Sequence, residues 1–393
     1  MKILITTDWY KPAVNGVVTS VLSLAEGLEK LGHEVRILTL SGSRHSRKEG
    51  RVTYIGSAGA GKIYPSARFL ITTGHKYIKE LEEWQPDVVH SQCEFSTYFL
   101  AKKIAKDCGC PIVHTYHTIY EDYTSYFCPS QRVGKHLAAF YSRMILRTAD
   151  EVIVPTEKIS SLLEGYGVET PVTVIPSGLR LEQFSHVECS RISELREELG
   201  ISDDDMVLVY LGRLAREKNV DELLDLMKDQ GDPGLKLLIV GDGPYRGKLQ
   251  EEADAGNITD RVIFTGMVDP SEVAYYYRLG QIFVSASTSE TQGLTYIEAM
   301  ACGLPLLCRQ DKCLDRVVKN GITGYTYRDA GDFKIKLGLM LHNPDLAKEM
   351  GGRAGEAAFT GYSETGFARK VLAVYTRAVV RNRNIQLRRA AVI

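Results

Sequence analysis

Several features that mark other protein classes are missing from this chain of 393 residues. Charge of neither sign dominates, because 48 Lys and Arg stand against 49 Asp and Glu, so bulk charge gives no reason to expect a nucleic acid partner. No apolar run approaches the roughly 20 residues that a membrane-spanning helix needs. The chain turns polar directly after Ile5, so no signal peptide is expected.

The eight cysteines also lack the spacing of a structural zinc site. Cys108 and Cys110 are separated by a single residue, and Cys302, Cys308 and Cys313 contain no paired C-x-x-C motif. Scattered cysteines of this kind are typical of reduced thiols in the cytoplasm. We therefore expect a cytoplasmic protein that has neither disulfides nor structural zinc.

What the sequence does contain is one pattern that repeats along its whole length: a short β-branched run, a turn and an amphipathic helical stretch. Near-continuous apolar runs that alternate with helices are typical of parallel strands buried on both faces. The pattern therefore predicts an α/β fold with two doubly wound, Rossmann-like sheets. The predicted strands are residues 2–7, 34–40, 87–92, 111–117, 151–156 and 172–178, then 206–214, 235–243, 261–268, 282–287 and 305–309.

The length of the chain favours two domains. A polar segment over residues 185–205 is the predicted link between them. We expect an N-terminal domain over residues 1–185, a C-terminal domain over 186–365 and a last helix over 366–393 that crosses back to the first domain. Parallel sheets bind ligands at the carboxyl ends of their strands, so two facing sheets predict a ligand site in the cleft between them.

Two cations, Arg213 and Lys218, follow the first predicted strand of the second half. Converging cations suit a diphosphate, whose charge they offset, although a solvated basic face would contain the same residues. After the next strand, Gly241 and Gly243 allow the backbone to approach a ligand closely, as they would in an ordinary turn. These loops alone leave both interpretations open.

The segment SETQGLTYIEAMACGLP is more informative, because Glu290 and Glu298 lie on either side of Gly293. A helix is predicted over residues 294–301, and its free N-terminal amides favour an anion such as a phosphate. Carboxylates would repel that phosphate, so they suit neutral hydroxyl groups instead. A helix with an acidic first turn would explain Glu290 but not Glu298.

Together, the motifs G-R-L-x-x-E-K-N, G-D-G-P and E-x7-E resemble the donor half of the retaining family 4 glycosyltransferases, which have the GT-B fold of two Rossmann-like domains facing across a cleft. The resemblance covers nearly the whole chain. It implies that Arg213 and Lys218 bind the donor diphosphate, that Glu290 contacts the donor sugar and that Glu298 contacts the ribose. The other donor-binding residues that we expect are Gly16, Gly241, Met267, Val268, Gly293, Leu294 and Thr295.

The stretch HTYHTIYEDYTSYF over residues 114–127 and the motif P-x-x-N-G-V-V-T-S resemble the bacterial diacylglycerol glucosyltransferases, which transfer glucose from UDP-glucose to 1,2-diacylglycerol. The resemblance places His117 at the reacting face of the donor sugar. The tyrosines Tyr120, Tyr123 and Tyr126 are the candidate acceptor-binding residues. Metal binding by the two histidines is not expected, because they lie at a strand end. The candidate catalytic residues are His117, Glu290, Arg213 and Lys218.

Diacylglycerol stays in a bilayer, so this hypothesis needs a membrane-binding surface. The predicted helix over residues 130–150 mixes basic and bulky apolar side chains, as interfacial helices on anionic lipid do. An ordinary helix that faces a core with a basic outer face would show the same composition. The candidate membrane residues are Arg132, Lys135, Phe140, Arg143, Met144 and Arg147.

The predicted function is therefore transfer of glucose, with retention, to the 3-hydroxyl of 1,2-diacylglycerol at the inner face of the cell membrane. The resemblance implies that the leaving diphosphate takes the acceptor's proton, with no metal or cofactor required. We expect no nucleic acid partner, and no protein partner is evident. Two alternatives stay open: the same chemistry on a cell-wall polymer, a phosphoinositide or a soluble sugar, and a sugar-nucleotide epimerase or hydrolase of GT-B fold.

Overall fold

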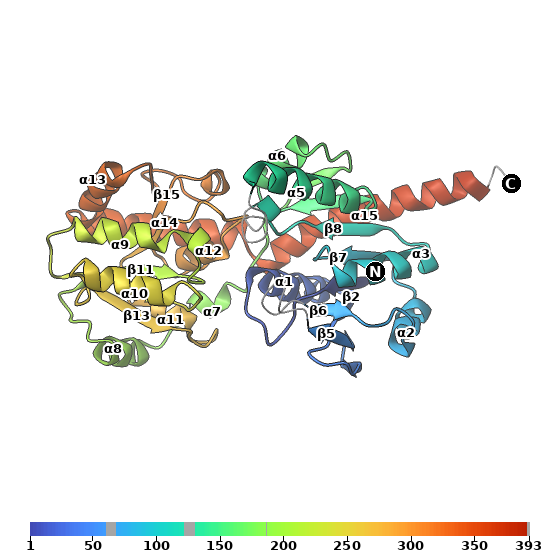
Figure 1. The fold of residues 1–393 in the computed structure, drawn as a ribbon, viewed down its shortest axis with the longest axis horizontal. Helices are drawn as coiled ribbons and strands as arrows, with labels where there is room; N and C mark the ends of the chain where they lie inside the picture. The colour runs from blue at the N-terminus through green and yellow to red at the C-terminus, as the bar shows by residue number, and fades with distance from the viewer. Residues whose placement is uncertain (60–67, 122–129, 186, 391–393) are drawn as a thin grey trace. The chain divides into compact units, whose positions relative to one another are not determined.

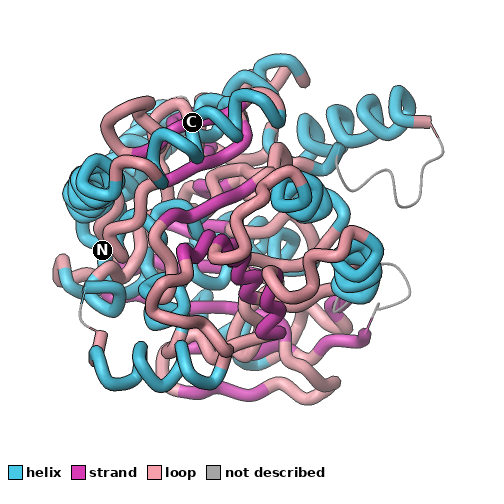
Figure 2. Tube along the Cα trace, turned by 90° about the vertical axis from the view of Figure 1, so that its left-hand side faces the viewer, coloured by secondary structure: helices cyan, strands magenta, loops and turns pink. Residues whose placement is uncertain are grey.

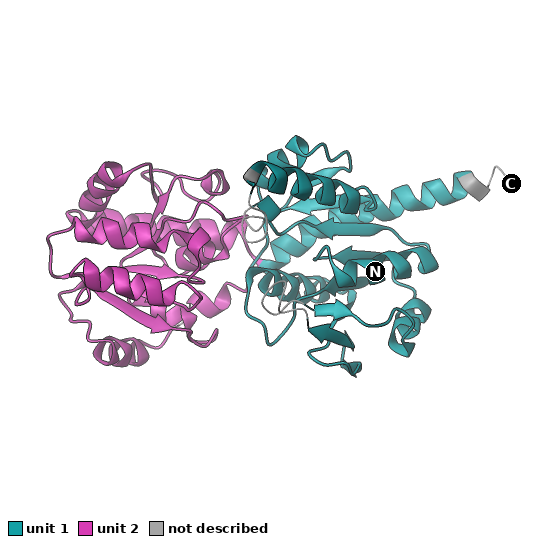
Figure 3. Ribbon diagram, viewed as in Figure 1, with its two compact units in different colours: residues 1–179, 364–393 teal, residues 180–363 magenta. Residues whose placement is uncertain are grey.

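The computed structural model describes residues 1–59, 68–121, 130–185 and 187–390 (Figure 1). The chain divides into two compact units, shown in Figure 3: unit 1 comprises residues 1–179 and 364–393, and unit 2 comprises residues 180–363. Each unit contains a large, mainly parallel sheet. In Figure 2 most strands, magenta, lie between helices, cyan. The predicted α/β class with two Rossmann-like sheets is confirmed.

The large sheet of unit 1 has the strand order β10-β9-β8-β7-β1-β2-β4-β3. Its neighbouring strands pair in parallel except β3 and β4, which are antiparallel. A separate antiparallel pair is formed by β5 and β6. The strands are β1 (Lys2–Thr7), β2 (Glu34–Leu40), β3 (Arg47–Glu49), β4 (Val52–Ile55), β5 (Ser57–Gly59), β6 (Arg68–Leu70), β7 (Val88–Ser91), β8 (Ile112–Thr115), β9 (Glu151–Val154) and β10 (Val172–Val174).

The last helix of the chain belongs to unit 1. Phe367, Val371 and Tyr375 of this helix are buried in one core with Val21 and Leu24 of the first helix. The helices of unit 1 are α1 (Gly16–Lys30), α2 (Lys76–Trp84), α3 (Ser96–Cys108), α5 (Gln131–Leu146), α6 (Glu157–Gly165) and α15 (Glu364–Ala390).

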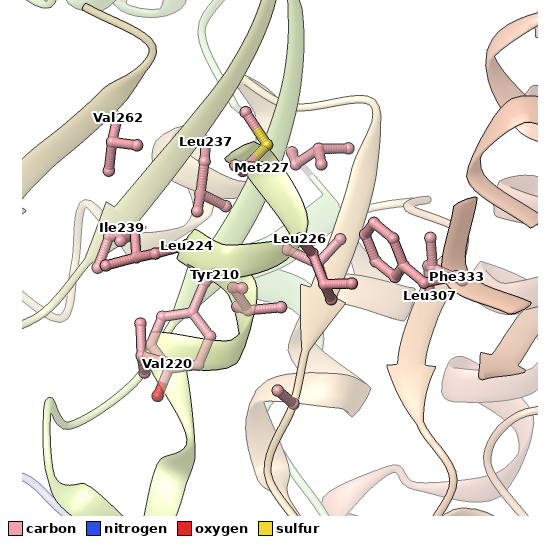
Figure 4. Packing of buried hydrophobic residues seen from close by; sticks show 14 of the residues in the cluster. Tyr210, Val220, Leu224, Leu226, Met227, Leu237, Ile239, Val262, Leu307 and Phe333 are labelled. Atoms are coloured by element: carbon pink, nitrogen blue, oxygen red, sulfur yellow. The ribbon is translucent and has the colours of Figure 1, made fainter. Parts of the chain in front are cut away.

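Unit 2 has the strand order β13-β12-β11-β14-β15-β16, with parallel pairing between the named strands. Figure 4 shows part of its core, where Tyr210, Leu237 and Phe333 pack with their neighbours. The strands are β11 (Met206–Leu211), β12 (Leu235–Val240), β13 (Val262–Gly266), β14 (Ile282–Ser285), β15 (Leu306–Arg309) and β16 (Gly324–Tyr327). The α-helices are α7 (Glu182–Ser185), α8 (Cys189–Glu198), α9 (Val220–Lys228), α10 (Arg246–Ala255), α11 (Val273–Arg278), α12 (Leu294–Ala301), α13 (Ala330–Leu341) and α14 (Pro344–Gly361).

The predicted strands are present, but most of them end earlier than predicted. The strand predicted over 206–214 ends at Leu211, and the strand predicted over 111–117 ends at Thr115. In both cases the residues beyond the strand form the loops that contain the candidate site residues. The predicted helix over 294–301 has those bounds in the structure. Among the described residues, no helix is both long and apolar enough to cross a membrane.

Candidate active site

The donor-binding candidates of unit 2 follow four neighbouring strands. β13, β12, β11 and β14 lie side by side and run parallel, so their carboxyl ends meet at one edge of the sheet. The loops after these strands contain Met267, Gly241, Lys218 and Glu290 in that order across the sheet. This edge is where open parallel sheets bind their ligands.

Two ion pairs engage the predicted cations at this edge. Lys218 donates a 2.6 Å hydrogen bond from its Nζ to Oε1 of Glu290, and both side chains are about one-fifth exposed (20% and 19%). Arg213 pairs with Glu217, which was not among the predicted site residues. The Ser289 hydroxyl donates to the backbone oxygen of Glu217 at 2.9 Å and so joins the two loops. The structure thus places Arg213, Lys218 and Glu290 in two ion pairs on loops that this hydrogen bond joins.

Two glycines in these loops are required by a positive φ and by atoms packed close to them. Gly293 has a φ of 72°, and a Cβ built on it would lie 2.3 Å from the Tyr296 ring. Gly241 has a φ of 132°, and a Cβ there would lie 2.1 Å from the carbonyl oxygen of Gly212. Because a side chain fits at neither position, both loops keep their backbone bare at the ligand-binding edge.

Glu298 lies on α12, one turn after the helix begins, and is oriented by a neighbouring tyrosine. The Tyr277 hydroxyl donates to Oε2 of Glu298 at 2.8 Å. Burial raises the pKa of Glu298 above its ordinary value, and the hydrogen bond from Tyr277 acts against that rise. Tyr277 itself is fully buried. One carboxylate oxygen is therefore held in place by the core, which fixes the direction of the other.

The remaining donor candidates are accessible to different degrees. Met267 is 75% exposed, whereas Val268, Leu294 and Thr295 are partly buried. The N-terminal end of α12 begins at Leu294 after Gly293, and no side chain caps it. The residue before the helix therefore does not compete with an anion for its first backbone amides.

Unit 1 collects a second set of polar side chains at the carboxyl ends of β1, β7 and β8, which are neighbours in its sheet. Asp8 follows β1, Gln92 and Glu94 follow β7, and His117 follows β8. Gln92 and Glu94 are almost fully buried (1% and 3% exposed). This edge differs from that of unit 2 because its polar groups are mostly withdrawn from solvent.

His117 is held by a buried amide. Its Nε2 lies 2.7 Å from Oε1 of Gln92, and the Nε2 of Gln92 lies 3.1 and 3.2 Å from the two ring nitrogens of His90. Burial lowers the pKa of His117 to about 4, although the nearby Glu94 carboxylate acts in the opposite direction. His117 is therefore a neutral imidazole near neutral pH.

Tyr120 is the one acceptor candidate within the described residues, because Tyr123 and Tyr126 lie outside them. The Tyr120 hydroxyl donates to Oε2 of Glu94, whose other oxygen lies 3.2 Å from Nε2 of His114. The Tyr120 ring packs edge-to-face against the rings of Phe95, Tyr116 and Tyr141.

Asp8 shares this buried environment. Its Oδ1 accepts a 2.7 Å hydrogen bond from the backbone amide of Thr97, and its Oδ2 is buried without a hydrogen-bond partner among the described residues. Burial raises the pKa of Asp8 to about 6, with a smaller contribution from the charge of Glu94. Asp8 is thus a carboxyl group that gains a proton more readily than an exposed one.

Gly16 begins α1, and the side chain of Asn15 caps that helix by accepting from the amide of Val18 at 3.0 Å. Gly16 itself, the first residue of the helix, has no side chain. Among the described residues, no group of three or more His, Cys, Asp or Glu side chains is arranged to hold a metal ion.

Helix α5 has large apolar side chains on its exposed side. At 100° per residue they fall within an arc of about 60°, and the neighbouring arc contains basic residues. The apolar residues are Val133, Leu137, Phe140 and Met144, which are 42–60% exposed. The basic residues beside them are Arg132, His136, Arg143 and Arg147, whereas Lys135 lies away from the stripe, 3.7 Å from Glu121. An interfacial helix would have an exposed stripe of this kind.

Sequence reasoning missed Gln92, Glu217 and Tyr277. Gln92 follows a buried strand, so its position at a carboxyl end was the available signal. Glu217 was visible only as the acid between two cations. Tyr277 gave no signal, because its contact with Glu298 joins residues 21 positions apart on different helices.

Comparison with known proteins decides the family. The sequence model for "Glycosyltransferase Family 4" matches residues 14–183, and the model for "Glycosyl transferases group 1" matches residues 191–357. An alpha-monoglucosyldiacylglycerol synthase of Streptococcus pneumoniae is 35% identical over 97% of this chain and 87% of its own length. The chain is a family 4, group 1 glycosyltransferase. An Acholeplasma laidlawii relative of this glycosyltransferase, also called alpha-monoglucosyldiacylglycerol synthase, is 31% identical over 97% of this chain and 98% of its own.

Solved structures of GT-B fold match this glycosyltransferase along almost its whole length. The Anabaena protein HepE, solved in complex with UDP-glucose, has a TM-score of 0.75 at 17% identity and covers 96% of this chain and 100% of its own. Sucrose-phosphate synthase from Thermosynechococcus elongatus has a TM-score of 0.76 at 21% identity, with 97% and 99% covered. These similarities confirm the fold. Membership of a glycosyltransferase family also favours transfer over the epimerase or hydrolase alternative.

Proposed function

We propose that the protein transfers glucose from UDP-glucose, with retention, to the 3-hydroxyl of 1,2-diacylglycerol and so makes alpha-monoglucosyldiacylglycerol. The observation that carries this proposal is the similarity of 35% and 31% identity, over nearly the whole chain, to two proteins named alpha-monoglucosyldiacylglycerol synthase. The geometry of unit 2 supports the donor half of the proposal, and the exposed stripe of α5 supports a lipid acceptor.

The donor binds at the carboxyl edge of the unit 2 sheet. Lys218 and Arg213 contact the diphosphate, and the amides of residues 293–295 contribute at the N-terminal end of α12. Glu290 accepts hydrogen bonds from sugar hydroxyls, and Glu298 accepts them from the ribose. In the structure Lys218 and Glu290 neutralise each other at 2.6 Å. Donor binding would give each of them a new partner, a phosphate for the lysine and a hydroxyl for the glutamate.

The reaction needs stabilisation of charge on the leaving diphosphate. Arg213 and Lys218 provide it, because both are cations placed where negative charge develops. The diphosphate then accepts the proton of the attacking 3-hydroxyl on the same face of the sugar. His117 lies at the reacting face as a neutral group. No metal and no cofactor is needed for this sequence of events.

The acceptor is reached at the surface of the membrane. The exposed apolar stripe of α5 enters the interface between lipid headgroups and acyl chains, while Arg132, Arg143 and Arg147 lie beside anionic headgroups. Tyr120, together with Tyr123 and Tyr126, borders the acceptor. The protein is thus a peripheral enzyme on the inner face of the cell membrane.

The test is transfer of radiolabelled glucose from UDP-glucose into mixed micelles that contain 1,2-diacylglycerol. We expect label in a monoglucosyl lipid, dependent on diacylglycerol, and a loss of about a hundredfold or more in Glu290→Ala. Release of UDP without labelled lipid would refute the acceptor and leave the donor site standing. A screen of soluble sugars, phosphoinositides and cell-wall fragments would then identify the acceptor.

A further inference from the structure

A chain of buried polar side chains leads from the last helix of the molecule to His117. The Tyr375 hydroxyl of α15 lies 2.6 Å from Nδ1 of His90, and the Thr115 hydroxyl lies 2.7 Å from Nε2 of the same ring. Both ring nitrogens also lie within 3.2 Å of Nε2 of Gln92. His90 and Gln92 are 0% and 1% exposed, so this chain is part of the core of unit 1.

The direction of the hydrogen bond to His117 follows from the chemistry of the amide. The NH₂ group of Gln92 can only donate, and it faces the His90 ring. The amide oxygen can only accept, and it lies 2.7 Å from Nε2 of His117. His117 must therefore donate from Nε2, which means that the proton of its neutral ring is on that nitrogen.

The surroundings of His117 keep the ring uncharged. The titratable groups around it are Glu94, His114 and His90. Glu94 favours the charged ring, but it is itself engaged by the Tyr120 hydroxyl and by His114. Burial outweighs this attraction and holds the pKa of His117 at about 4.

The second ring nitrogen is left for a ligand. Among the described residues, no group forms a hydrogen bond with Nδ1 of His117, and the side chain is partly exposed. A neutral ring protonated at Nε2 has a lone pair on Nδ1, which accepts a hydrogen bond and cannot donate one. A hydroxyl group fits such a nitrogen, whereas a phosphate oxygen without a proton does not.

We propose that Gln92 is a positioning residue that holds His117 as the neutral Nε2–H form, so that Nδ1 accepts a hydrogen bond from a hydroxyl of the bound donor sugar. This inference rests on the proposed function, which places His117 at the donor sugar. It adds Gln92 as the residue that decides which ring nitrogen of His117 donates and which accepts a hydrogen bond. The core of unit 1, through His90, holds Gln92 in the orientation that this role needs.

The first experiment measures which ring nitrogen of His117 carries the proton, by ¹⁵N NMR of the whole protein with labelled histidine. The signal of His117, one of nine histidines, is identified by its loss in His117→Gln. We expect a protonated Nε2 and a bare Nδ1 at neutral pH, and a mixture of the two forms in Gln92→Leu. A proton on Nδ1, or a doubly protonated ring, would overturn the proposal. This readout needs no substrate, so it stands apart from any failure to find a lipid product.

The second experiment compares two substitutions of Gln92 by their pH profiles of kcat/KM for UDP-glucose. Gln92→Leu removes the acceptor, and we expect a loss of about tenfold in kcat/KM, the size of one hydrogen bond. Gln92→Glu keeps an oxygen against Nε2 but adds negative charge, which raises the pKa of His117. We therefore expect its activity to be recovered at high pH and its acid limb to move upward by about one unit or more.

The control is Tyr98→Phe, which removes another buried hydroxyl of unit 1, one that donates to the backbone oxygen of Ile145 at 2.9 Å. We expect it to lower the melting temperature without moving the acid limb of the profile. Equal acid limbs in Gln92→Glu, Gln92→Leu and the parent, with all three folded, would show that Gln92 serves only the core and would overturn the proposal.

Discussion

The two sheets of this glycosyltransferase present different chemistry at their carboxyl edges. In unit 2 the charged side chains are partly exposed and paired with one another, as Lys218 is with Glu290. In unit 1 the polar side chains are mostly buried. Hydrogen bonds there join neutral pairs such as Gln92 and His90, and they also engage the Glu94 carboxylate. Ion pairs near solvent exchange partners at small cost, whereas buried networks hold one geometry. On the proposed function, the partly exposed ion pairs of unit 2 would meet the charged diphosphate, and the buried network of unit 1 would orient an uncharged hydroxyl group.

The largest expected effect comes from removing one of the two cations of unit 2, Lys218. We expect Lys218→Ala to lower glucosyl transfer by about 10²–10³-fold, the usual cost of removing one group that stabilises transition-state charge. The loss should appear mainly in kcat, measured by radiolabelled transfer at saturating UDP-glucose.

The matched control is Lys336→Ala, because Lys336 has almost the same exposure (21%) and pairs with Asp332 at 2.8 Å on α13, away from the site. We expect this control to keep nearly full activity. Equal losses in the two variants would mean that Lys218 acts only through stability and would remove it from the diphosphate site.

A second prediction concerns the exposed stripe on α5. Phe140→Asp places a charge where 60% of a phenylalanine is exposed, and the lost burial in lipid is worth about 1.5–3 kcal/mol. We expect binding to anionic vesicles to weaken by about tenfold or more, measured by sedimentation with vesicles. Binding of the parent should also fall as salt concentration rises.

Ile335→Asp serves as the control for that variant, since Ile335 is an exposed apolar residue (65%) on α13 of unit 2. Its vesicle binding should match that of the parent. If both variants bound vesicles as the parent does, α5 would not be the membrane surface.

The third prediction is smaller and tests the buried edge of unit 1. The pKa of Asp8 is raised to about 6 in the folded protein, so the folded state carries the cost of a buried charge above that pH. Asp8→Asn removes this cost. The free energy of unfolding of Asp8→Asn should exceed that of the parent by the largest amount above pH 6. The difference between the two should shrink as the pH falls toward 4.

Urea unfolding at a series of pH values measures this difference. His117 changes the stability of the protein in the opposite direction. Its pKa in the folded protein is about 4, so as the pH falls below the ordinary histidine pKa the unfolded chain binds the proton more readily and the folded state becomes less stable. A difference between parent and Asp8→Asn that did not change with pH would contradict the raised pKa of Asp8.

Local sequence patterns predicted much of the fold, and the reasons are physical. Buried parallel strands are continuous apolar runs, which are visible in the sequence. Gly303 and Pro305 come just after α12, and a glycine followed by a proline is a typical signal for the end of a helix. The short strands β3 to β6 and the edge strand β16 were missed. β16 reads Gly-Tyr-Thr-Tyr, which has no apolar run, and its pairing with β15 supplies what its sequence lacks.

The individual residues of the candidate site could be predicted from the sequence. The hydrogen bonds and ion pairs between them could not. The loops after strands pointed to Lys218 and Glu290 separately, and the hydrogen bond between them joins residues 72 positions apart. The hydrogen bond between Gln92 and His117 likewise depends on the register of β7 against β8, which no local motif encodes. Residue type reveals the chemistry that a position offers, and only the fold reveals which positions meet.

The return of α15 to unit 1 has a consequence for synthesis on the ribosome. Residues 180–363 form an uninterrupted unit, whereas the core of unit 1 needs Phe367, Val371 and Tyr375 from beyond it. The growing chain must therefore expose part of the first unit's apolar surface until the second unit has been translated. Unit 2 can reach its native packing first, in reverse of the usual N-terminal order of folding. A translation stall within α15 would leave unit 2 folded and unit 1 open to chaperones.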